Sequence, residues 1–532
     1  MSLAFDEFGR PYIIVREQDK KKRMTGTETI KRNLSYAGTI AETLKTSLGP
    51  KGMDKMIVSP DGDVLITNDG ATIVEKMQIA HPVARLMVEL SQSQDNQIGD
   101  GTTGIVVLTG ELIKQAQRLL DKGLHPLKVA SGFEKASDFV VHHLDKLKED
   151  KGDPKREDLI KAAMTALSSK VVSSCKRHLA EVAVDAVLKV ADLERKDVNF
   201  EMIKIVGKTG GAISDTELVE GIIIDKDFSH PQMTKVVENA KIAILTCPFE
   251  PPKPKTKYNL NITNAEDFKK LAAQEQEYFE KMVKTVKDSG AEVVMCQWGF
   301  DDEANHLLHS HGLNAVRWVS GTDIELLALA TGARIVPRFE NLTEDKLGFA
   351  GHIEEVSFGT TQCNMVVVKR PKKAESVTLL IRGGSATIVD ETRRSLNDAL
   401  CVIRNLIRDP SLIVGGGAVE LNSSLALRKY ADEIAGIEQY AIRGFADALE
   451  QVIVILAENT GIDAIQSLSE ARSKQISEKT HVFGVNCDTA SVENMQEYEV
   501  FETLASKKHQ VQLGTQVIKM LLKIDDLIER GR

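Results

Sequence analysis

The sequence predicts a multi-domain protein in which a mostly α-helical unit, built from both ends of the chain, surrounds a β-rich α/β middle. The chain has 532 residues, too many for one compact core at about 100–200 residues per domain. Apolar residues recur at helical spacing in the first and last thirds, whereas short β-rich runs alternate with helical segments between them. With 42% hydrophobic and 27% charged residues, the composition excludes collagen-like and broadly disordered chains.

The first third is expected to be mostly helical. Apolar residues recur at helical spacing over 24–48, 82–93 and 105–122, and the sequence Gly49-Pro50 stops the first of these patterns. A short strand over 63–67 leads into the turn Asn68-Asp69-Gly70. The polar stretch 149–158 marks a boundary, and a helical pattern then covers 159–193.

The middle of the chain is expected to alternate strands and helices. A glycine-rich turn at 207–211 precedes short β-rich runs at 220–225, 240–246, 292–296, 315–319, 334–336 and 365–368. Four prolines between positions 248 and 254 forbid helix and central strand, so this segment is predicted to leave the sheet as an extended arm. A charged helical pattern over 265–289 then brings the chain back.

The last third returns to helices. A strand over 377–381 ends in Arg382-Gly383-Gly384, and a long helix follows over 387–408. Gly415-Gly416-Gly417 is predicted to open a further helix. The final helix is expected to carry its apolar stripe on Leu513, Val517, Leu521, Ile524 and Ile528.

Charge and composition argue against two classes of partner. Sixty-eight basic and seventy-seven acidic side chains give a net charge of −9, so the chain has no global electrostatic attraction to nucleic acid or to an anionic membrane. Aromatic residues make up only 5%, which does not favour stacking on bases. We therefore expect no nucleic acid and no membrane among its partners.

The cysteines and the N-terminal segment predict a cytoplasmic protein. The six cysteines are far apart and contain no C-x-x-C pair, so zinc sites and redox dithiols are not predicted, and free thiols in a reducing compartment are. Residues 1–22 contain no apolar stretch of signal-peptide length. The longest apolar runs fall far short of the ~20 residues needed to span a bilayer.

The most informative cluster is Gly99-Asp100-Gly101-Thr102-Thr103-Gly104, which stands just before a predicted helix. Its glycines let the backbone approach a bulky anion, and the free amides at a helix start point at that anion. Asp100 offers hard oxygen ligands that suit Mg²⁺. Phosphate with magnesium is one interpretation, and a turn with an aspartate cap is the other. No Walker A sequence occurs.

Two further glycine loops and two carboxylates fit the same chemistry. Leu48-Gly49-Pro50-Lys51-Gly52 follows a helix, and Gly415-Gly416-Gly417 precedes one. Asp69 follows a strand, and Asp398 lies on the long helix beside its apolar stripe. Either carboxylate could orient or deprotonate water for phosphoryl transfer, although taken alone each is explained more simply as a helix cap or part of a solvated helix face.

Other constellations predict no site. His142 and His143 are adjacent, so they point to different sides of a helix and cannot share a metal. His306, His309 and His311 have no acidic or cysteine partner at ligand spacing, which favours surface histidines. The run 20–23 is expected to be a solvated basic segment, and no G-x-S-x-G nucleophile elbow is present.

Taken together and in this order, these segments resemble the group II chaperonins, the t-complex polypeptide family. The resemblance covers essentially the whole chain and includes one particular subunit type of the eukaryotic ring complex, through residues 3–11, 227–232, 247–255 and 297–306. The matching elements are Thr46–Lys55, Thr67–Ile73, Gly99–Gly104, Gly415–Ala418, Ala457-Glu458-Asn459 and Ile524-Asp525-Asp526. One departure is that Gln451–Val454 lacks the proline that many members have in this helix, which puts a local kink in doubt.

The resemblance implies three domains in a chaperonin fold. A mostly helical equatorial ATPase domain would comprise residues 1–150 and 409–532. An α/β intermediate hinge domain would comprise 151–222 and 375–408. An α/β apical, substrate-binding domain would comprise 223–374, with a helical lid protrusion near 248–275.

The resemblance also implies the site. Asp69 and Asp398 match the catalytic carboxylates that position water, Asp100 matches the Mg²⁺ ligand, and Lys170 matches a lysine that senses the γ-phosphate. The implied cofactors are ATP or ADP and Mg²⁺, with K⁺ as a further candidate. The implied nucleotide-binding residues are Gly49, Pro50, Gly101, Thr102, Thr103, Gly104, Ser169, Lys170, Gly416, Cys487 and Glu502.

The implied activity is ATP hydrolysis that drives lid closure over a non-native polypeptide, with actin and tubulin among the family's substrates. The implied partners are seven paralogous subunits in a hetero-octameric ring, stacked as two rings. Two alternatives stay open at this stage. A small-molecule kinase or phosphatase would use the same phosphate and Mg²⁺ chemistry, and a monomeric interaction protein would act outside any ring.

Overall fold

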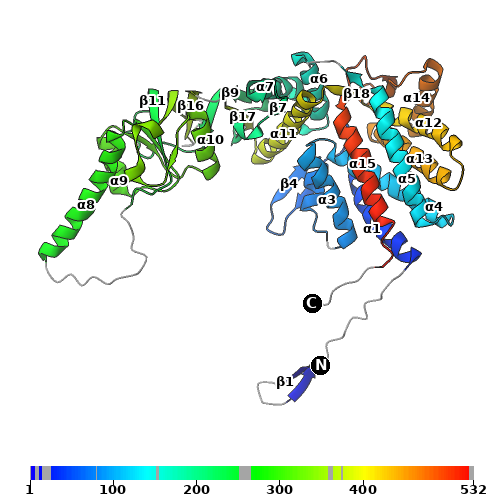
Figure 1. The fold of residues 1–532 in the computed structure, drawn as a ribbon, viewed down its shortest axis with the longest axis horizontal. Helices are drawn as coiled ribbons and strands as arrows, with labels where there is room; N and C mark the ends of the chain where they lie inside the picture. The colour runs from blue at the N-terminus through cyan, green and yellow to red at the C-terminus, as the bar shows by residue number, and fades with distance from the viewer. Residues whose placement is uncertain are drawn as a thin grey trace.

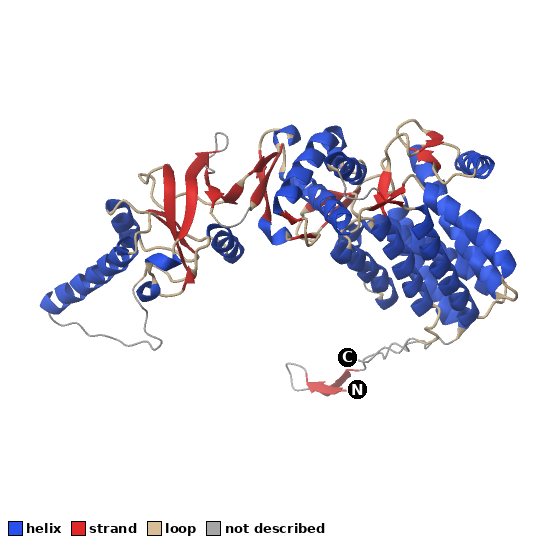
Figure 2. Cartoon of the chain, turned by 45° about the horizontal axis from the view of Figure 1, so that its top comes forward, coloured by secondary structure: helices blue, strands red, loops and turns tan. Residues whose placement is uncertain are grey.

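The computed structural model describes residues 2–5, 11–14, 26–79, 81–150, 155–250, 265–357, 364–372 and 376–526. The chain forms an elongated molecule with a large helical unit at one end, an α/β unit at the other and a smaller connecting region between them (Figure 1). Figure 2 shows that the helical unit holds only short strands, whereas the far unit is built on a broad sheet. The predicted order of helical ends around a β-rich middle is therefore confirmed.

Both ends of the chain build the helical unit. Its helices α15 and α13, from the last third, pack against α4 and α5 from the first third. The first-third elements are α1 (Thr27–Lys45), β3 (Lys55–Val58), β4 (Val64–Thr67), α2 (Gly70–Lys76), α3 (Pro82–Gln97), α4 (Thr102–Asp121), α5 (Pro126–Leu147) and β5 (Glu149–Asp150). The last-third elements are β18 (Ser411–Val414), α12 (Ala418–Glu433), α13 (Glu438–Thr460), α14 (Ala464–Glu478), β19 (Phe483–Asn486), β20 (Ser491–Asn494), β21 (Phe501–Thr503) and α15 (Leu504–Leu521).

Helix α4 is the central helix of this unit, since it packs against α1, α3, α13 and α15 and most of its residues are buried. Ile105, Leu112 and Ile113 are fully buried, and a helix that is apolar all round belongs inside a core. Gly110 has no Cβ, and one placed there would collide with Ala41 of α1. This close packing holds α4 tightly against α1.

The connecting region joins segments from before and after the α/β unit. Its β17 pairs in parallel with β8 and antiparallel with β9, and helix α11 packs against α6 and α7. Its apolar residues belong to the same buried cluster as those of the helical unit. Its elements are α6 (Arg156–Leu167), a 3₁₀ turn (Val171–Cys175), α7 (Lys176–Val190), β6 (Ala191–Asp192), β7 (Asp197–Val198), β8 (Ile203–Thr209), β9 (Glu217–Val219), β17 (Val377–Gly383) and α11 (Ala386–Arg408).

The α/β unit has a separate core around a seven-stranded mixed sheet, with β14 paired to β11 beside the order β10-β16-β15-β11-β12-β13. The strands β11, β12 and β13 are parallel, and the other pairs along this order are antiparallel. Its elements are β10 (Gly221–Ile224), β11 (Val236–Leu245), α8 (Ala265–Asp288), β12 (Val293–Cys296), α9 (Asp302–Ser310), β13 (Asn314–Val316), α10 (Gly321–Thr331), β14 (Ile335–Val336), β15 (Gly348–Ser357) and β16 (Asn364–Pro371). Separately, β1 (Ser2–Phe5) pairs with β2 (Pro11–Ile14).

Several sequence expectations are wrong in detail. Residues 207–209 are not a turn, because β8 runs through Thr209 and pairs with β17; only Gly210 and Gly211 take the left-handed conformation of a turn. The pattern over 159–193 is two helices separated by a 3₁₀ turn. In α15 the fully buried face passes through Val511, Ile518 and Leu521, whereas Leu513 and Val517 are half-buried.

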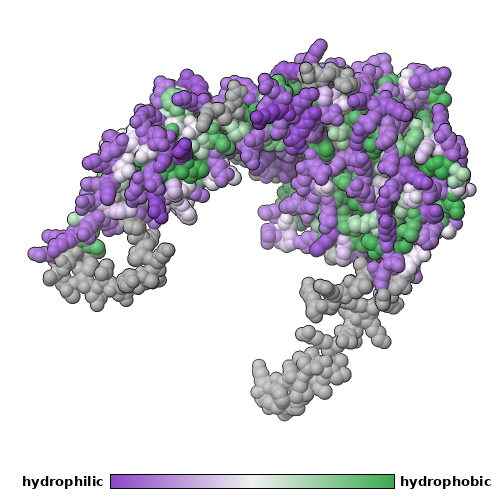
Figure 3. Space-filling model, viewed as in Figure 1, coloured by the Kyte–Doolittle hydropathy of each residue, from purple (hydrophilic) through white to green (hydrophobic). Residues whose placement is uncertain are grey.

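Other expectations are confirmed, or concern residues outside the described ranges. Helix α13 continues without a break through Gln451–Val454, in agreement with the missing proline. Helix α8 begins where the return from the proline-rich arm was predicted, while residues 251–264 of that arm, like Ile528 and the basic run 20–23, lie outside the described residues. The surface in Figure 3 is mostly hydrophilic, with apolar patches over the helical unit. In the described part of the chain, no helix combines the length and apolarity needed to cross a membrane.

Candidate functional site

A cavity of about 340 Å³ lies where the helical unit meets the connecting region. Its walls come from segments far apart in sequence, since residues near positions 50, 100, 165, 400, 416, 487 and 502 all contribute. Predicted site residues that line it are Gly49, Pro50, Asp100, Gly101, Thr102, Thr103, Gly104, Ser169, Lys170, Asp398, Gly416, Cys487 and Glu502. Asp69 is the one predicted site residue absent from the walls. It lies behind Thr102, which does line the cavity.

The loop before α4 presents backbone amides to this cavity. Gly101 is the N-cap of α4 with φ of +74°, a left-handed conformation that favours glycine, and no side chain caps the helix. A Cβ there would also collide with Gln510 of α15. The first-turn amides of Thr102, Thr103 and Gly104 have no partner within the helix. The loop therefore offers an anion site at the positive end of a 20-residue helix.

The other two glycine loops face the same cavity. Gly49, with φ of +87°, follows α1, and Gly416 and Gly417, with φ of +67° and +76°, precede α12. Asn459 of α13 holds the first loop in place by donating to the backbone oxygens of Lys45 and Leu48. Three turns that require glycine therefore line the same cavity. The sequence alone could not show that these three loops come together.

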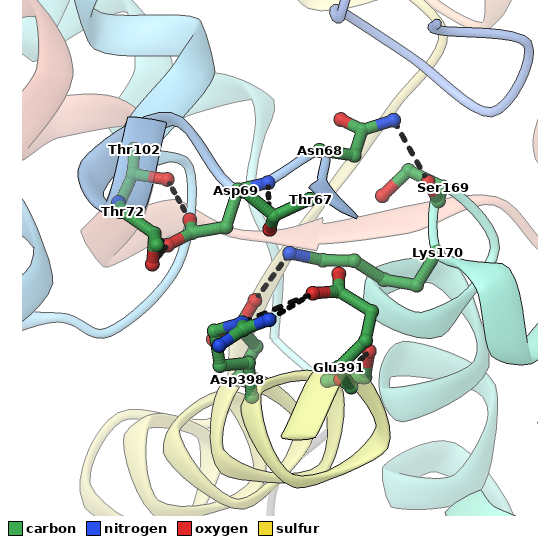
Figure 4. A network of polar contacts seen from close by, with 11 residues as sticks. Thr67, Asn68, Asp69, Thr72, Thr102, Ser169, Lys170, Glu391 and Asp398 are labelled. Atoms are coloured by element: carbon green, nitrogen blue, oxygen red, sulfur yellow. Dashed lines mark hydrogen bonds and ion pairs between the residues drawn. The ribbon is translucent and has the colours of Figure 1, made fainter. Parts of the chain in front are cut away.

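Asp69 is held rigidly by hydrogen bonds. It caps α2: the Thr72 amide and hydroxyl donate to its Oδ2 at 3.0 and 2.6 Å, while the Thr102 hydroxyl donates to Oδ1 at 2.9 Å (Figure 4). Burial alone would raise the pKa of Asp69, but attraction by Lys170 and these hydrogen bonds outweigh it and hold the pKa below 3.8. Asp69 is thus a fixed negative charge behind the loop at the start of α4.

Asp398 and Lys170 form a buried ion pair inside the cavity. Asp398 Oδ2 lies 2.9 Å from Lys170 Nζ, and the two side chains are 17% and 8% exposed. In Figure 4 the Lys170 side chain points from the segment between α6 and the 3₁₀ turn toward Asp398 on α11. Burial raises the pKa of Asp398 to about 7, with Lys170 opposing and Asp69 adding to the rise. A carboxylate with that pKa can accept a proton at neutral pH.

Asp100 fits a magnesium ligand. It lines the cavity directly before Gly101, and burial raises its pKa although the Gly101 amide and the charges of Lys507 and Lys170 oppose the rise. No side chain among the described residues donates a hydrogen bond to its carboxylate. A cation shared with a phosphate would compensate this buried charge, and Mg²⁺ is usually held by one or two carboxylates together with substrate phosphates. Among the described residues, no group of three or more histidine, cysteine or acidic side chains could hold a metal ion.

The structure adds wall residues that sequence reasoning missed. Lys507 of α15 contacts two carboxylates, Glu420 at 2.5 Å and Glu502 at 2.9 Å. Asn68 donates to the backbone oxygen of Ser169 at 3.1 Å and so ties the helical unit to the connecting region. Lys161 of α6 pairs with Glu499 across 2.6 Å at the cavity wall. No local spacing reveals these contacts, since apart from Lys507 with Glu502 their members lie far apart in sequence.

The chain matches the model of the TCP-1/cpn60 chaperonin family over residues 40–532. It is 46% identical over 527 residues to "T-complex protein 1 subunit epsilon" of Encephalitozoon cuniculi, with 99% of this chain and 98% of that protein covered. It is 41% identical to "Thermosome subunit beta" of Sulfurisphaera tokodaii and 40% identical to that of Sulfolobus acidocaldarius. These two alignments cover 98% of this chain and 95% and 94% of those proteins.

Proposed function

The chain belongs to the TCP-1/cpn60 chaperonin family, and from this premise we propose that it is an ATP-dependent subunit of a hetero-oligomeric double-ring chaperonin. It closes around and folds non-native cytoplasmic proteins, with actin and tubulin in the range of clients. Its partners are seven paralogous subunits in each eight-membered ring. The similarity to an epsilon subunit and to thermosome subunits supports a ring-forming chaperonin.

The three-domain division belongs to the same proposal. The helical unit is the equatorial domain (1–150 and 409–532), the connecting region is the intermediate hinge (151–222 and 375–408), and the α/β unit is the apical domain (223–374). Two observations support it. The α/β unit has its own core, and the connecting region is crossed twice by the chain, at α6–β9 and at β17–α11.

The geometry supports a specific division of labour in ATP hydrolysis. The amides of Thr102, Thr103 and Gly104 bind phosphate oxygens. Asp100 would hold Mg²⁺, which would neutralise phosphate charge and orient the substrate when bound. Lys170 contacts a terminal phosphate oxygen. Because Lys170 then no longer pairs with Asp398, the carboxylate of Asp398 becomes free. Asp398 then takes a proton from the attacking water as the water oxygen bonds to the γ-phosphorus and the bond from that phosphorus to ADP breaks. Asp69 meanwhile fixes Thr102 and the loop.

ATP hydrolysis is coupled to lid closure because the catalytic residues lie on two different domains. Lys170, just after α6, and Asp398 of α11 lie on the hinge, whereas Asp100 and the phosphate loop lie on the equatorial domain. Complete catalytic geometry therefore requires the hinge to lie against the equatorial domain. The nucleotide stabilises that state over an open one, and β17 at the start of α11 passes the movement toward the apical sheet.

The observation that carries the proposal is the convergence of Asp398 and Lys170 from the hinge with the glycine loops of the equatorial domain around one cavity. The test is a native mass measurement of the purified complex, with identification of its chains, combined with Mg²⁺-dependent ATP turnover. A particle of about 16 subunits with ATPase activity is expected. A 60 kDa monomer, or ATP turnover that requires a small-molecule acceptor, would instead favour an interaction protein or a kinase.

A further inference from the structure

Helix α11 of the connecting region holds the C-terminal end of α3, directly before the phosphate loop Gly99–Gly104. The last backbone oxygens of an α-helix have no partner within the helix. Arg404 of α11 donates from Nη2 to the backbone oxygen of Gln97 at 3.3 Å. The next residue, Asn405, donates from Nδ2 to the backbone oxygen of Ile98 at 2.8 Å. The last turn of α3 contains no basic residue, so Arg404 also supplies the positive charge that stabilises a helix C-terminus.

A third contact places the same face of α11 against the next residue of the chain, Gly99. A Cβ at Gly99 would collide with the side chain of Cys401, so glycine allows the two segments to touch here. Asp398, Cys401 and Asn405 follow one another at spacings of three and four residues, which puts them on one face of the helix. The face that carries Asp398 into the cavity therefore also holds the residues that precede the phosphate loop.

The end of α3 is in turn tied to the phosphate loop. The side chain of Gln94 is fully buried and donates to the backbone oxygen of Asp100 at 2.7 Å. His509 of α15 contacts the side chains of Gln94 and Gln97, at 2.7 and 2.5 Å. A shift of this end of α3 would therefore move Asp100, the residue that fits Mg²⁺.

Arg404 and Asn405 are themselves held in place on the connecting region. Asn405 is only 7% exposed, and its contact with α3 is the shorter of the two. The guanidinium of Arg404 lies over the ring of Phe200, 4.8 Å from the ring centroid, in a cation–π contact. Phe200 begins a 3₁₀ turn, Phe200–Met202, of the connecting region. Arg404 is therefore anchored on one unit and reaches across to the other.

We propose that Asn405 is a positioning residue for ATP hydrolysis, which keeps α11 docked on the end of α3 and so fixes Asp398 relative to the phosphate loop. The inference rests on the proposed function, since it deepens the same site. Asn405 does not itself line the cavity, so nucleotide binding by the equatorial loops does not need it. The position of Asp398 does, and a displacement of about 1 Å can cost about 100-fold in rate.

The test compares Asn405→Asp with the wild type in the purified complex. This substitution keeps the size of the side chain, but it removes the N–H donor and places a carboxylate against the backbone oxygen of Ile98. We expect the dissociation constant of ADP, measured by calorimetry, to change by no more than about threefold, while kcat for ATP falls at least about tenfold. Arg408→Met is the matched control and should keep both values, because Arg408 lies on the next turn of α11 and pairs with Asp197 inside the connecting region.

Alkylation of Cys401 gives a readout that does not depend on turnover. Cys401 is 6% exposed and packs against Gly99 while α11 is docked, so undocking exposes its thiol. Asn405→Asp is expected to speed alkylation of Cys401 by iodoacetamide at least about tenfold, measured by peptide mass spectrometry in the presence of Mg·ADP. Cys296, in the separate core of the α/β unit, should react at an unchanged rate, and Arg408→Met should leave both rates unchanged.

Arg404→Gln serves as a second variant if Asn405→Asp does not fold, because it removes only the longer contact and its charge. It is expected to lower kcat and to speed alkylation of Cys401 by about three- to tenfold. A folded variant with wild-type kcat, or with a lowered kcat but unchanged alkylation of Cys401, would overturn the inference. A wild type without ATP turnover would instead refute the proposed function, whereas faster alkylation of Cys401 in the variant would still support the docking contact.

Discussion

Replacing Asp398 with asparagine should stabilise the folded chain while it stops turnover. Burial raises the pKa of this carboxyl from 3.8 to about 7, so at pH 8 the folded protein carries a charge that its surroundings disfavour. Each pKa unit is worth about 1.4 kcal/mol, which gives about 4 kcal/mol for the whole rise. Lys170 loses its nearest partner in Asp398→Asn, although Asp69 and Glu391 still attract it. Because removing one partner of a buried ion pair also costs stability, we expect the net gain at pH 8 to be smaller than this figure.

The stability difference between Asp398→Asn and the wild type should depend on pH in a defined direction. Between about pH 4 and pH 7 the folded wild type keeps a proton that the unfolded chain has released, so its stability falls as the pH rises through this range. Asp398→Asn has no such group. Its advantage over the wild type should be small near pH 4, grow up to about pH 7 and stay constant above it.

The assay is urea unfolding of both proteins at pH 5, 6, 7 and 8, with ATP turnover and nucleotide binding measured alongside. Asp390→Asn is the control, since Asp390 is an exposed aspartate on the same helix. We expect nucleotide binding to persist and turnover to fall at least about 100-fold in Asp398→Asn. An unchanged unfolding midpoint at pH 8, or an advantage that grows toward low pH, would refute the reasoning.

Three further outcomes follow from the geometry. Asp100→Ala should make nucleotide affinity nearly independent of Mg²⁺, which calorimetry with and without EDTA would measure; a retained Mg²⁺ effect would contradict the metal assignment. Gly101→Ala should cost about 1–3 kcal/mol of stability and weaken nucleotide binding at least about tenfold, because φ is +74° and Gln510 blocks the added Cβ; thermal unfolding and titration would test this. Lys161→Ala should speed nucleotide release by no more than about fivefold, since its pair with Glu499 is partly exposed; stopped-flow at low and high salt would show whether the effect is screened.

Much of the fold was predictable because burial sets the pattern of the long helices. Helices α1, α4 and α11 were expected close to their observed bounds, since their apolar residues follow the helical period. Strand β15 was not expected. Its sequence, Gly348–Ser357, contains two glycines, a histidine and two glutamates, and it is a strand only because β11 and β16 pair with it on both sides.

The site was predictable where one short segment carries the geometry. Gly99–Gly104 combines the left-handed glycine, the helix start and the carboxylate within six residues, so its chemistry could be read locally. The Glu420–Lys507 pair could not, because its members are 87 residues apart and only the packing of α12 and α15 brings them together. The pairing of Asp398 with Lys170 likewise depends on how α11 packs against α6.

The central claim is that segments from both ends of the chain and from the hinge bind one Mg·ATP. The most direct measurement is a cryo-EM structure of the purified complex with Mg²⁺ and a non-hydrolysable ATP analogue. We predict one nucleotide per chain in the 340 Å³ cavity, with its phosphates at Thr102–Gly104 and its terminal phosphate within reach of Lys170. A nucleotide bound elsewhere, or one contacted by the equatorial loops while Lys170 and Asp398 remain far away in a closed ring, would contradict the account.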